Sequence, residues 1–201
     1  YSTTYDRVMK RGYVICGTND EFPGFSQEML LGGGEERWEG FDVDLCRAIA
    51  AGIFGDENAI EFEIVNGKTR FEFLLDGTID VLSAATTYTY TRNVAKKLEF
   101  MPTTYYDGQG FIVRKTLGVS SAKQMEGARI CFSGSGTAAK NIADFMKLHG
   151  INYIPVDVPP NQKTRDAYKR GECDMYGTDR SGLASNRLSF NDPSRHMILS
   201  L

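Results

Sequence analysis

Residues 79–92 read Ile79-Asp80-Val81-Leu82-Ser83-Ala84-Ala85-Thr86-Thr87-Tyr88-Thr89-Tyr90-Thr91-Arg92, an apolar strand that turns into a hydroxyl-rich loop and ends in an arginine. Arginine offers a rigid fork of N–H donors that matches a carboxylate and stays charged at any working pH. Hydroxyl and backbone groups around this fork would form a compact anion site. The alternative is that Arg92 only pairs with a neighbouring acid of the protein, and the pattern leaves both interpretations open.

The strand at 79–82 is the last of an alternating series in the first half of the chain. Strands are predicted at 12–17, 60–65 and 79–82, and helices at 41–54 and 70–75. This order predicts an α/β fold in which parallel strands carry helices on both faces of the sheet. The helix at 41–54 is expected to bury apolar side chains that recur every four residues, namely Phe41, Leu45, Ile49 and Ile53.

The second half repeats this plan. Strands are predicted at 128–132, 152–156, 173–176 and 197–199, and helices at 138–149, at 161–170 and from 181 onward. Residues 75–81 and 169–175 share a helix–glycine–strand step, which suggests a weak internal duplication. The two glycines in 105–113 suit a crossing between lobes. We therefore predict lobe 1 at 1–108, lobe 2 at 109–195, and the start of a return crossing to lobe 1 at 196–201.

Composition restricts the classes of function. The 201-residue chain is 41% hydrophobic and 24% charged, with a net charge of −3, so no basic surface for nucleic acid is indicated. Its apolar runs are far shorter than the roughly 20 residues that a membrane span needs. No secretory signal is present at Tyr1, so the chain either begins as a mature protein or was never exported.

Four cysteines are divided equally between the two halves. They are Cys16, Cys46, Cys131 and Cys173, and their spacing contains no Cys-x-x-Cys pair, which argues against a zinc ribbon or a thioredoxin-like site. Pairing within each half would staple each lobe separately and would imply an oxidising compartment. Four buried free thiols in a cytosolic protein are the alternative.

A glycine loop follows the first strand of the second half. Gly134-x-Gly136-x-x-Ala139 opens a helix, and Asp157 lies about twenty residues further on, which is close to a dinucleotide-binding fingerprint. Backbone N–H groups at a helix N-terminus also bind carboxylates. A carboxylate site, a dinucleotide site and a plain tight turn are therefore all compatible with the loop.

Two further candidates follow strands. Asp179 could receive an ammonium group, since ligands of open α/β sheets bind beyond the carboxyl ends of strands, or it could cap the next helix. Phe22 and Phe25 follow the first strand and could cover a ligand or anchor their loop.

No catalytic or metal-binding pattern is present in the sequence. His149 stands at a predicted helix end and His196 is isolated, so no motif pairs a histidine with a nucleophile. Asp42 and Asp44 do not share a helix face and instead suit the first turn of a helix. We expect no enzyme activity, no metal and no cofactor.

Several stretches together resemble one known family. They are Trp38-Glu39-Gly40-Phe41-Asp42-Val43-Asp44-Leu45-Cys46-Arg47-Ala48 and the segments 80–92, 105–111 and 173–179. From Gly12 to about Leu199 the chain resembles family 3-type periplasmic solute-binding proteins of polar amino-acid ABC transporters, specifically the general L-amino-acid branch. The resemblance implies the type II periplasmic-binding-protein fold, in which two lobes close on an amino acid. Such proteins continue beyond the equivalent of Leu201 and complete lobe 1, so we expect a C-terminal part to be missing.

The resemblance also implies a ligand set. Arg92 and Thr87 would bind the ligand α-carboxylate, joined by Thr137 from the other lobe. Asp179 and the Ala85 carbonyl would bind the α-ammonium, and Phe22 would cover the ligand. The chain has Ser135-Gly136-Thr137 where the family usually has a Gly-Thr-Thr turn, and its Ala84-Ala85 loop is smaller and less polar than is common.

The family pattern places cysteines at all four positions and implies the disulfides Cys16–Cys46 and Cys131–Cys173. It also implies a periplasmic protein, freed of its signal peptide, that is a monomer and delivers a free L-amino acid to a membrane ABC permease. A cyclohexadienyl or prephenate dehydratase-like enzyme and a ligand-sensing domain are the alternatives on this fold. The sequence leaves open which amino acid binds.

Overall fold

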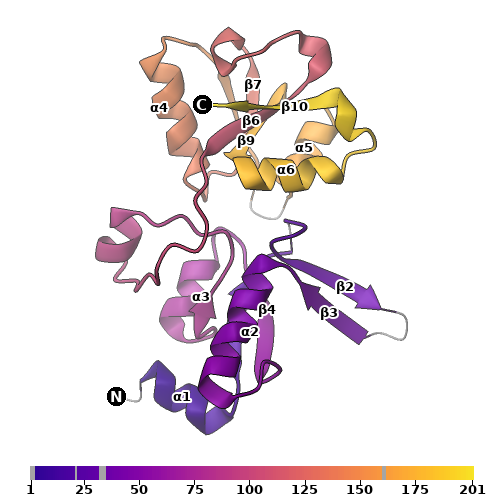
Figure 1. Cartoon of the computed structure of the whole chain (residues 1–201). Helices are drawn as coiled ribbons and strands as arrows, with labels where there is room; N and C mark the ends of the chain where they lie inside the picture. The colour runs from indigo at the N-terminus through magenta and orange to yellow at the C-terminus, as the bar shows by residue number, and fades with distance from the viewer. Residues whose placement is uncertain (1–2, 21, 32–34, 160–161) are drawn as a thin grey trace. The chain divides into compact units, whose positions relative to one another are not determined.

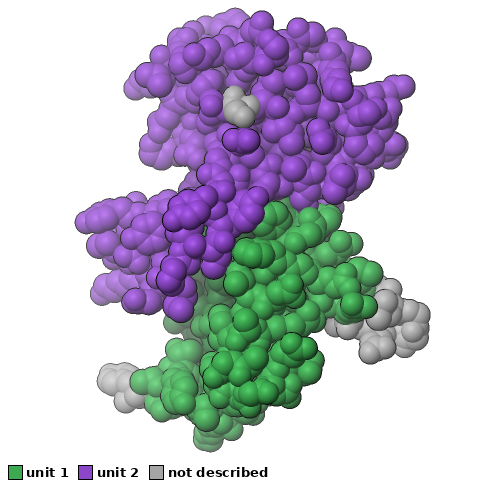
Figure 2. Space-filling view, viewed as in Figure 1, with its two compact units in different colours: residues 1–86 green, residues 87–201 purple. Residues whose placement is uncertain are grey.

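The chain forms two compact units. The computed structural model describes residues 3–20, 22–31, 35–159 and 162–201. Unit 1 comprises residues 1–86 and unit 2 comprises residues 87–201 (Figure 2). The lobe boundary after residue 108 and the return crossing at 196–201 remain predictions.

The described residues of unit 1 form three helices, a sheet of three strands and a separate pair of antiparallel strands. The helices are α1 (Thr4–Arg11), α2 (Phe41–Phe54) and α3 (Arg70–Asp76). The strands are β1 (Val14–Thr18), β2 (Gln27–Leu31), β3 (Glu35–Glu39), β4 (Ile60–Ile64) and β5 (Val81–Leu82) (Figure 1). Helix α1 and the antiparallel β2–β3 pair were not predicted from the sequence.

In unit 2, residues 87–159 and 162–201 form five strands, three α-helices and four short helical turns. Its strands are β6 (Gln109–Arg114), β7 (Arg129–Phe132), β8 (Ile154–Asp157), β9 (Met175–Asp179) and β10 (His196–Ser200), and its α-helices are α4 (Ala138–Leu148), α5 (Thr164–Lys169) and α6 (Arg180–Leu188). The short turns are η1 (Thr91–Ala95, π-helical), η2 (Lys115–Leu117), η3 (Ala122–Gln124) and η4 (Pro193–Arg195). The predicted helix start at Asn161 lies outside the described residues. In the described part of the chain, no helix has both the length and the apolar character needed to cross a membrane.

The sheet of unit 1 is parallel, as predicted. Its strand order is β4-β1-β5, and β1 pairs parallel with both neighbours. Alternate residues of β1 face opposite sides of the sheet. Val14 packs with residues of α1 and α2, whereas Ile15 packs with residues of α3. Helices therefore cover both faces of this sheet.

Helix α2 spans the predicted residues, but its predicted buried stripe is wrong. Phe41, the first residue of that stripe, is 38% exposed, whereas Val43, Cys46 and Ala50 are fully buried. Cys46 is bonded to Cys16 of β1, so its face of the helix must lie against the sheet. Small side chains on that face allow close packing, and the larger apolar side chains lie toward its margins.

Unit 2 has a mixed sheet with the strand order β10-β6-β9-β7-β8. Strand β7 pairs parallel with β8 and β9, as predicted, whereas β6 pairs antiparallel with β9 and β10. Strand β10 occupies the segment for which we predicted the start of a return crossing. Phe111 and Ile112, adjacent in β6, belong to cores on opposite faces, the first with α4 and the second with α5 and α6. Figure 1 shows these helices on the two sides of the sheet.

The suspected internal duplication is visible in hydrogen bonding. The Asp80 N–H donates to the Ile15 carbonyl at 2.9 Å, and the Ile15 N–H donates to the Asp80 carboxylate at 2.8 Å. In unit 2 the Asp174 N–H donates to the Arg129 carbonyl at 2.9 Å, and the Arg129 N–H returns a bond to the Asp174 carboxylate at 2.9 Å. Each carboxylate also pairs with an arginine, Arg11 in unit 1 and Arg129 itself in unit 2.

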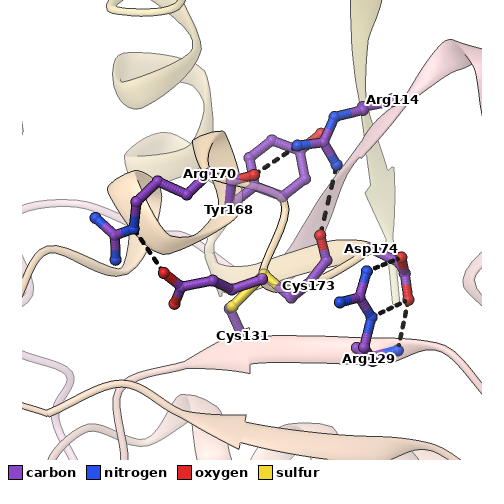
Figure 3. Close-up of a disulfide and its surroundings, with 8 residues drawn as sticks. Arg114, Arg129, Cys131, Tyr168, Arg170, Cys173 and Asp174 are labelled. Carbon is purple, nitrogen blue, oxygen red and sulfur yellow. Dashed lines mark hydrogen bonds and ion pairs between the residues drawn. A yellow bond between two sulfur atoms is a disulfide. The ribbon is translucent and has the colours of Figure 1, made fainter.

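Both implied disulfides are present. Cys16–Cys46 joins β1 to α2 with a Cα–Cα distance of 6.2 Å, and Cys131–Cys173 joins β7 to the loop before β9 at 5.6 Å. Figure 3 shows the second bond together with Arg114, which donates to the carbonyl of Cys173 at 3.5 Å. The pairing within halves is therefore confirmed, and the free-thiol alternative is wrong.

Candidate functional site

Arg92 is buried at the start of unit 2. It belongs to the short π-helical segment η1 and is only 7% exposed. Its Nη1 donates to the Thr87 carbonyl at 2.7 Å. Burial lowers the Arg92 pKa, and the carboxylate of Asp179 partly opposes that shift. Because arginine is not deprotonated in proteins, the site contains a buried cation within the electrostatic reach of an acid.

Asp179 stands where β9 meets α6, in the N-cap position of that helix. Across the described ranges its carboxylate accepts no capping hydrogen bond. Asp107 takes that role instead, because its carboxylate accepts hydrogen bonds from the Ser181 N–H at 3.2 Å and from the Ser181 hydroxyl. The interpretation of Asp179 as a helix cap is therefore wrong, and its charge acts on Arg92.

Two threonines complete the group of predicted residues that unit 2 brings together. Thr137 occupies the N-cap position of α4, and its hydroxyl lies 3.5 Å from that of Thr87. The carbonyl of Thr87 also accepts the hydrogen bond from Arg92. The arrangement can bind an anion through a guanidinium, two hydroxyls and the N-terminal end of a helix. The nearby Asp179 can bind a cation.

The glycine loop before α4 is not arranged for a pyrophosphate. The Gly134 N–H donates to the Asp157 carboxylate at 2.7 Å, and the Gly136 N–H donates to the Ser133 carbonyl at 3.2 Å. A Cβ at Gly134 would clash with the Asp157 carboxylate in its present position, so this close approach favours glycine. The N–H groups of both fingerprint glycines are therefore already hydrogen-bonded within the protein. The negative charge of Asp157 would also repel a phosphate group. The dinucleotide interpretation loses its physical basis.

Ala85 and Phe22 belong to unit 1. Ala85 has a φ of +45°, and its N–H donates to the Asp42 carboxylate at 3.1 Å. The Phe22 carbonyl accepts from the N–H groups of Phe25 and Ser26 at 2.9 Å, which closes a tight turn. The Phe25 ring packs edge-on against the Phe41 ring, with 6.1 Å between the ring centroids. Phe25 therefore anchors its loop, which was the alternative to covering a ligand.

Both histidines have structural contacts. His149 packs against Phe145 at 4.6 Å between ring centroids. The His196 Nδ1 lies 2.8 Å from the Tyr168 hydroxyl, and burial lowers the His196 pKa. Burial also raises the pKa of Tyr168 to about 12, so the hydroxyl that forms this hydrogen bond stays protonated. These contacts account for both side chains without a catalytic role.

Three acids hold the candidate loops in a way that was not predicted from the sequence, namely Asp42, Asp107 and Asp157. Asp42 and Asp44 were both placed in the first turn of a helix, and both lie there. The two differ in burial, because Asp44 is exposed whereas Asp42 lies on the side of α2 that faces the sheet. The implied Cys16–Cys46 disulfide was the available signal, because Cys46 lies one helical turn after Asp42 and is bonded to β1.

Comparison with known sequences identifies close relatives. The profile of the bacterial extracellular solute-binding proteins, family 3, matches residues 14–177. The general L-amino acid-binding periplasmic protein AapJ of Rhizobium johnstonii is 43% identical over 98% of this chain, and this chain covers 57% of AapJ. The glutamate/glutamine/aspartate/asparagine-binding protein BztA of Rhodobacter capsulatus is 40% identical, with the same coverage. The chain thus spans a little over half the length of these relatives.

A solved structure has the same fold. A periplasmic binding protein of an ABC transporter from Brucella ovis, with glutathione bound, superposes with a TM-score of 0.92 at 38% sequence identity. The match covers 100% of this chain and 62% of that protein. The predicted two-lobed type II fold is confirmed by this similarity.

Proposed function

Because the chain belongs to family 3 of the bacterial extracellular solute-binding proteins, we propose that it captures a free L-amino acid in the periplasm and delivers it to an ABC permease. Disulfides persist in oxidising compartments such as the periplasm, and both halves of this chain contain one. That the protein acts as a monomer stays a prediction. The proposal concerns an activity of whole proteins of this family, and this chain covers 57% of the length of the two relatives named above.

One observation carries the proposal: unit 2 holds a buried cation and an acid whose charges act on each other. Asp179 opposes the lowering of the Arg92 pKa by burial. A free amino acid carries a carboxylate and an ammonium on neighbouring atoms, so its site needs one positive and one negative group close together. Arg92 and Asp179 supply this pair, and the hydroxyls of Thr87 and Thr137 lie 3.5 Å apart within the same unit.

Each residue has a proposed role. The Arg92 guanidinium binds the ligand α-carboxylate through two parallel hydrogen bonds, a geometry that the arginine fork favours. Thr87 and Thr137 add hydroxyl and backbone donors to the same carboxylate. Asp179 binds the α-ammonium, and the Ala85 carbonyl accepts from it. The Phe22 ring covers the apolar part of the ligand. The residues named here are a proposal supported by the contacts within each unit.

The relatives suggest a broad choice of side chain. AapJ is named for general L-amino acids and BztA for glutamate, glutamine, aspartate and asparagine. The Brucella protein contains glutathione, whose γ-glutamyl end carries a free α-carboxylate and a free α-ammonium. All these ligands share the zwitterionic group that the proposed residues would recognise. We therefore propose that recognition of this group, more than of the side chain, dominates binding.

The alternative functions have less support. The relatives and the structure named above are described as binding proteins. The dehydratase-like alternative would need a general acid in the site, and the acids near it have other contacts or proposed roles. The sensing alternative would use the same ligand site and differ only in the partner. Transport therefore remains the proposed role.

A thermal-shift screen tests the function. The chain is heated alone and with each of the twenty L-amino acids or glutathione, and D-amino acids and glucose serve as controls. A ligand at about 100 times its dissociation constant adds roughly 2.7 kcal/mol to the free energy of unfolding. We expect several L-amino acids to raise the melting temperature and the controls to leave it unchanged. The absence of a shift with all of the L-amino acids would contradict the proposal.

A further inference from the structure

The carboxylate of Asp42 is buried against the loop that follows β5. Asp42 lies in the first turn of α2 and is only 6% exposed. One of its oxygens accepts from the Ser83 hydroxyl at 2.9 Å, and the other accepts from the Ala85 N–H at 3.1 Å. Both donors belong to the same three-residue segment, 83–85. A single side chain thus binds this loop at two points.

Burying a carboxylate is costly unless hydrogen bonds compensate. Desolvation raises the Asp42 pKa, and the bonds from Ser83 and Ala85 lower it in part. Asp44, two residues further along α2, offers a contrast, because its side chain is 73% exposed and pairs with Arg47 at 3.6 Å. Asp44 is therefore exposed to solvent, whereas Asp42 of the same helical turn is buried against the 83–85 loop.

The loop adopts a conformation that needs support. Ala85 has a φ of +45°, in the left-handed region that residues with a Cβ seldom adopt. Such a conformation persists where surrounding contacts hold it. The bond from the Ala85 N–H to Asp42 is a contact of this kind.

The same turn of α2 also holds the loop that contains Phe22. The Asp42 N–H donates to the Phe25 carbonyl at 2.8 Å, and the Phe41 N–H donates to the Gly24 carbonyl at 3.0 Å. Phe22 closes this loop through its own carbonyl. Asp42 consequently contacts both loops of unit 1 that carry proposed ligand residues, one through its side chain and the other through its backbone.

We propose that Asp42 is a positioning residue, which holds the 83–85 loop so that the Ala85 carbonyl is in place for the ligand ammonium. This inference rests on the proposed function. Asp42 does not contact the ligand in this account. Asp42 instead fixes the backbone of Ala85, whose carbonyl contacts the ligand. This support lowers the conformational entropy that the loop loses when the ligand binds.

The Asp42→Asn variant tests the role with little change in side-chain size. An amide has one acceptor oxygen in place of two, so the Ser83 hydroxyl or the Ala85 N–H loses its acceptor. We expect the dissociation constant for the amino acid that gives the largest thermal shift to rise roughly tenfold, because the ligand must then order the loop when it binds. Asp44→Asn is the matched control and should leave the dissociation constant unchanged.

Calorimetric titration at a temperature where circular dichroism shows both variants to be folded separates positioning from stability. A purely structural role would lower the melting temperature of Asp42→Asn and leave the affinity of the folded protein unchanged. An unchanged dissociation constant in Asp42→Asn would therefore overturn the proposal.

Amide hydrogen exchange gives a readout that needs no ligand. We expect the Ala85 amide to exchange faster in Asp42→Asn than in the unmodified chain, while amides of β1 keep their protection. If the unmodified chain binds no amino acid, the proposed function fails, and the exchange rate of Ala85 still decides whether Asp42 holds the loop. Equal exchange rates at Ala85 would overturn the holding role itself.

Discussion

Replacing Arg92 with alanine is expected to weaken amino-acid binding by about 2–5 kcal/mol, the usual cost of truncating one partner of a buried charge pair. This is a rise in the dissociation constant of roughly 30-fold to 5,000-fold. The reason is that Arg92 supplies the cation for the ligand α-carboxylate from a site with only 7% exposure. Without it, Asp179 would place an uncompensated negative charge beside that carboxylate. Calorimetric titration of both proteins measures the change.

Two further substitutions make the Arg92 experiment specific. Arg92→Lys keeps the charge but loses the fork, so it should also weaken binding, although less than alanine does. Arg195→Ala is the control, since Arg195 is exposed in unit 2 and pairs with Asp192 at 2.9 Å. We expect that control to bind normally. An Arg92→Ala protein with unchanged affinity would remove Arg92 from the site.

Removing the Cys131–Cys173 disulfide is expected to lower the free energy of unfolding by about 4 kcal/mol in the chain-entropy model. The bond closes a loop with a sequence separation of 42 residues. Its loss would raise the conformational entropy of the unfolded chain and would also detach the loop before β9 from β7. Urea denaturation of a Cys131→Ala, Cys173→Ala double variant measures the change.

Other contacts around this disulfide are expected to hold the loop before β9 in place when the disulfide is removed. Arg114 donates to the Tyr168 carbonyl at 2.5 Å, and Arg129 pairs with Asp174 at 2.8 Å, so the loop keeps its anchors (Figure 3). We therefore expect the double variant to fold and to show a lower urea midpoint. A Cys16→Ala, Cys46→Ala variant should lose a similar amount of the free energy of unfolding, because the two cysteines are separated by 30 residues in the sequence. A loss below about 1 kcal/mol for either variant would contradict the entropic account.

The elements with clear end signals were the most predictable from the sequence. Helix α2 begins after Gly40 and ends before Gly55, which adopts the left-handed conformation, and both bounds agree with the prediction. The parallel sheet of unit 1 followed from the alternation of strands and helices. Helix α1 was missed although its sequence carries a capping box, in which Thr3 and Asp6 exchange hydrogen bonds.

Features that depend on contacts between distant residues could not be predicted. The antiparallel pairing of β6 and β10 joins strands more than eighty positions apart, and no local pattern specifies it. The Asp42 carboxylate meets Ala85 across 43 positions. The buried stripe of α2 was wrong because a periodic pattern does not show which of two apolar faces lies against the sheet.

The candidate site was predicted in part by a general rule. Arg92 and Asp179 were singled out because each follows a strand of a parallel-type sheet, where ligands usually bind. The sequence could not separate a ligand role for Asp179 from helix capping. The structure argues against capping, because Asp107, more than seventy positions away, caps α6 instead, and the ligand role of Asp179 stays a proposal.

The central claim is that the chain recognises the zwitterionic group of a free amino acid. The most direct test is a calorimetric titration with three compounds: the L-amino acid that gives the largest thermal shift, its N-acetyl derivative and its α-amide. N-acetylation removes the ammonium that Asp179 would bind, and amidation removes the carboxylate that Arg92 would bind. We predict that only the unmodified amino acid binds measurably. Binding of either derivative with the affinity of the unmodified amino acid would contradict the account.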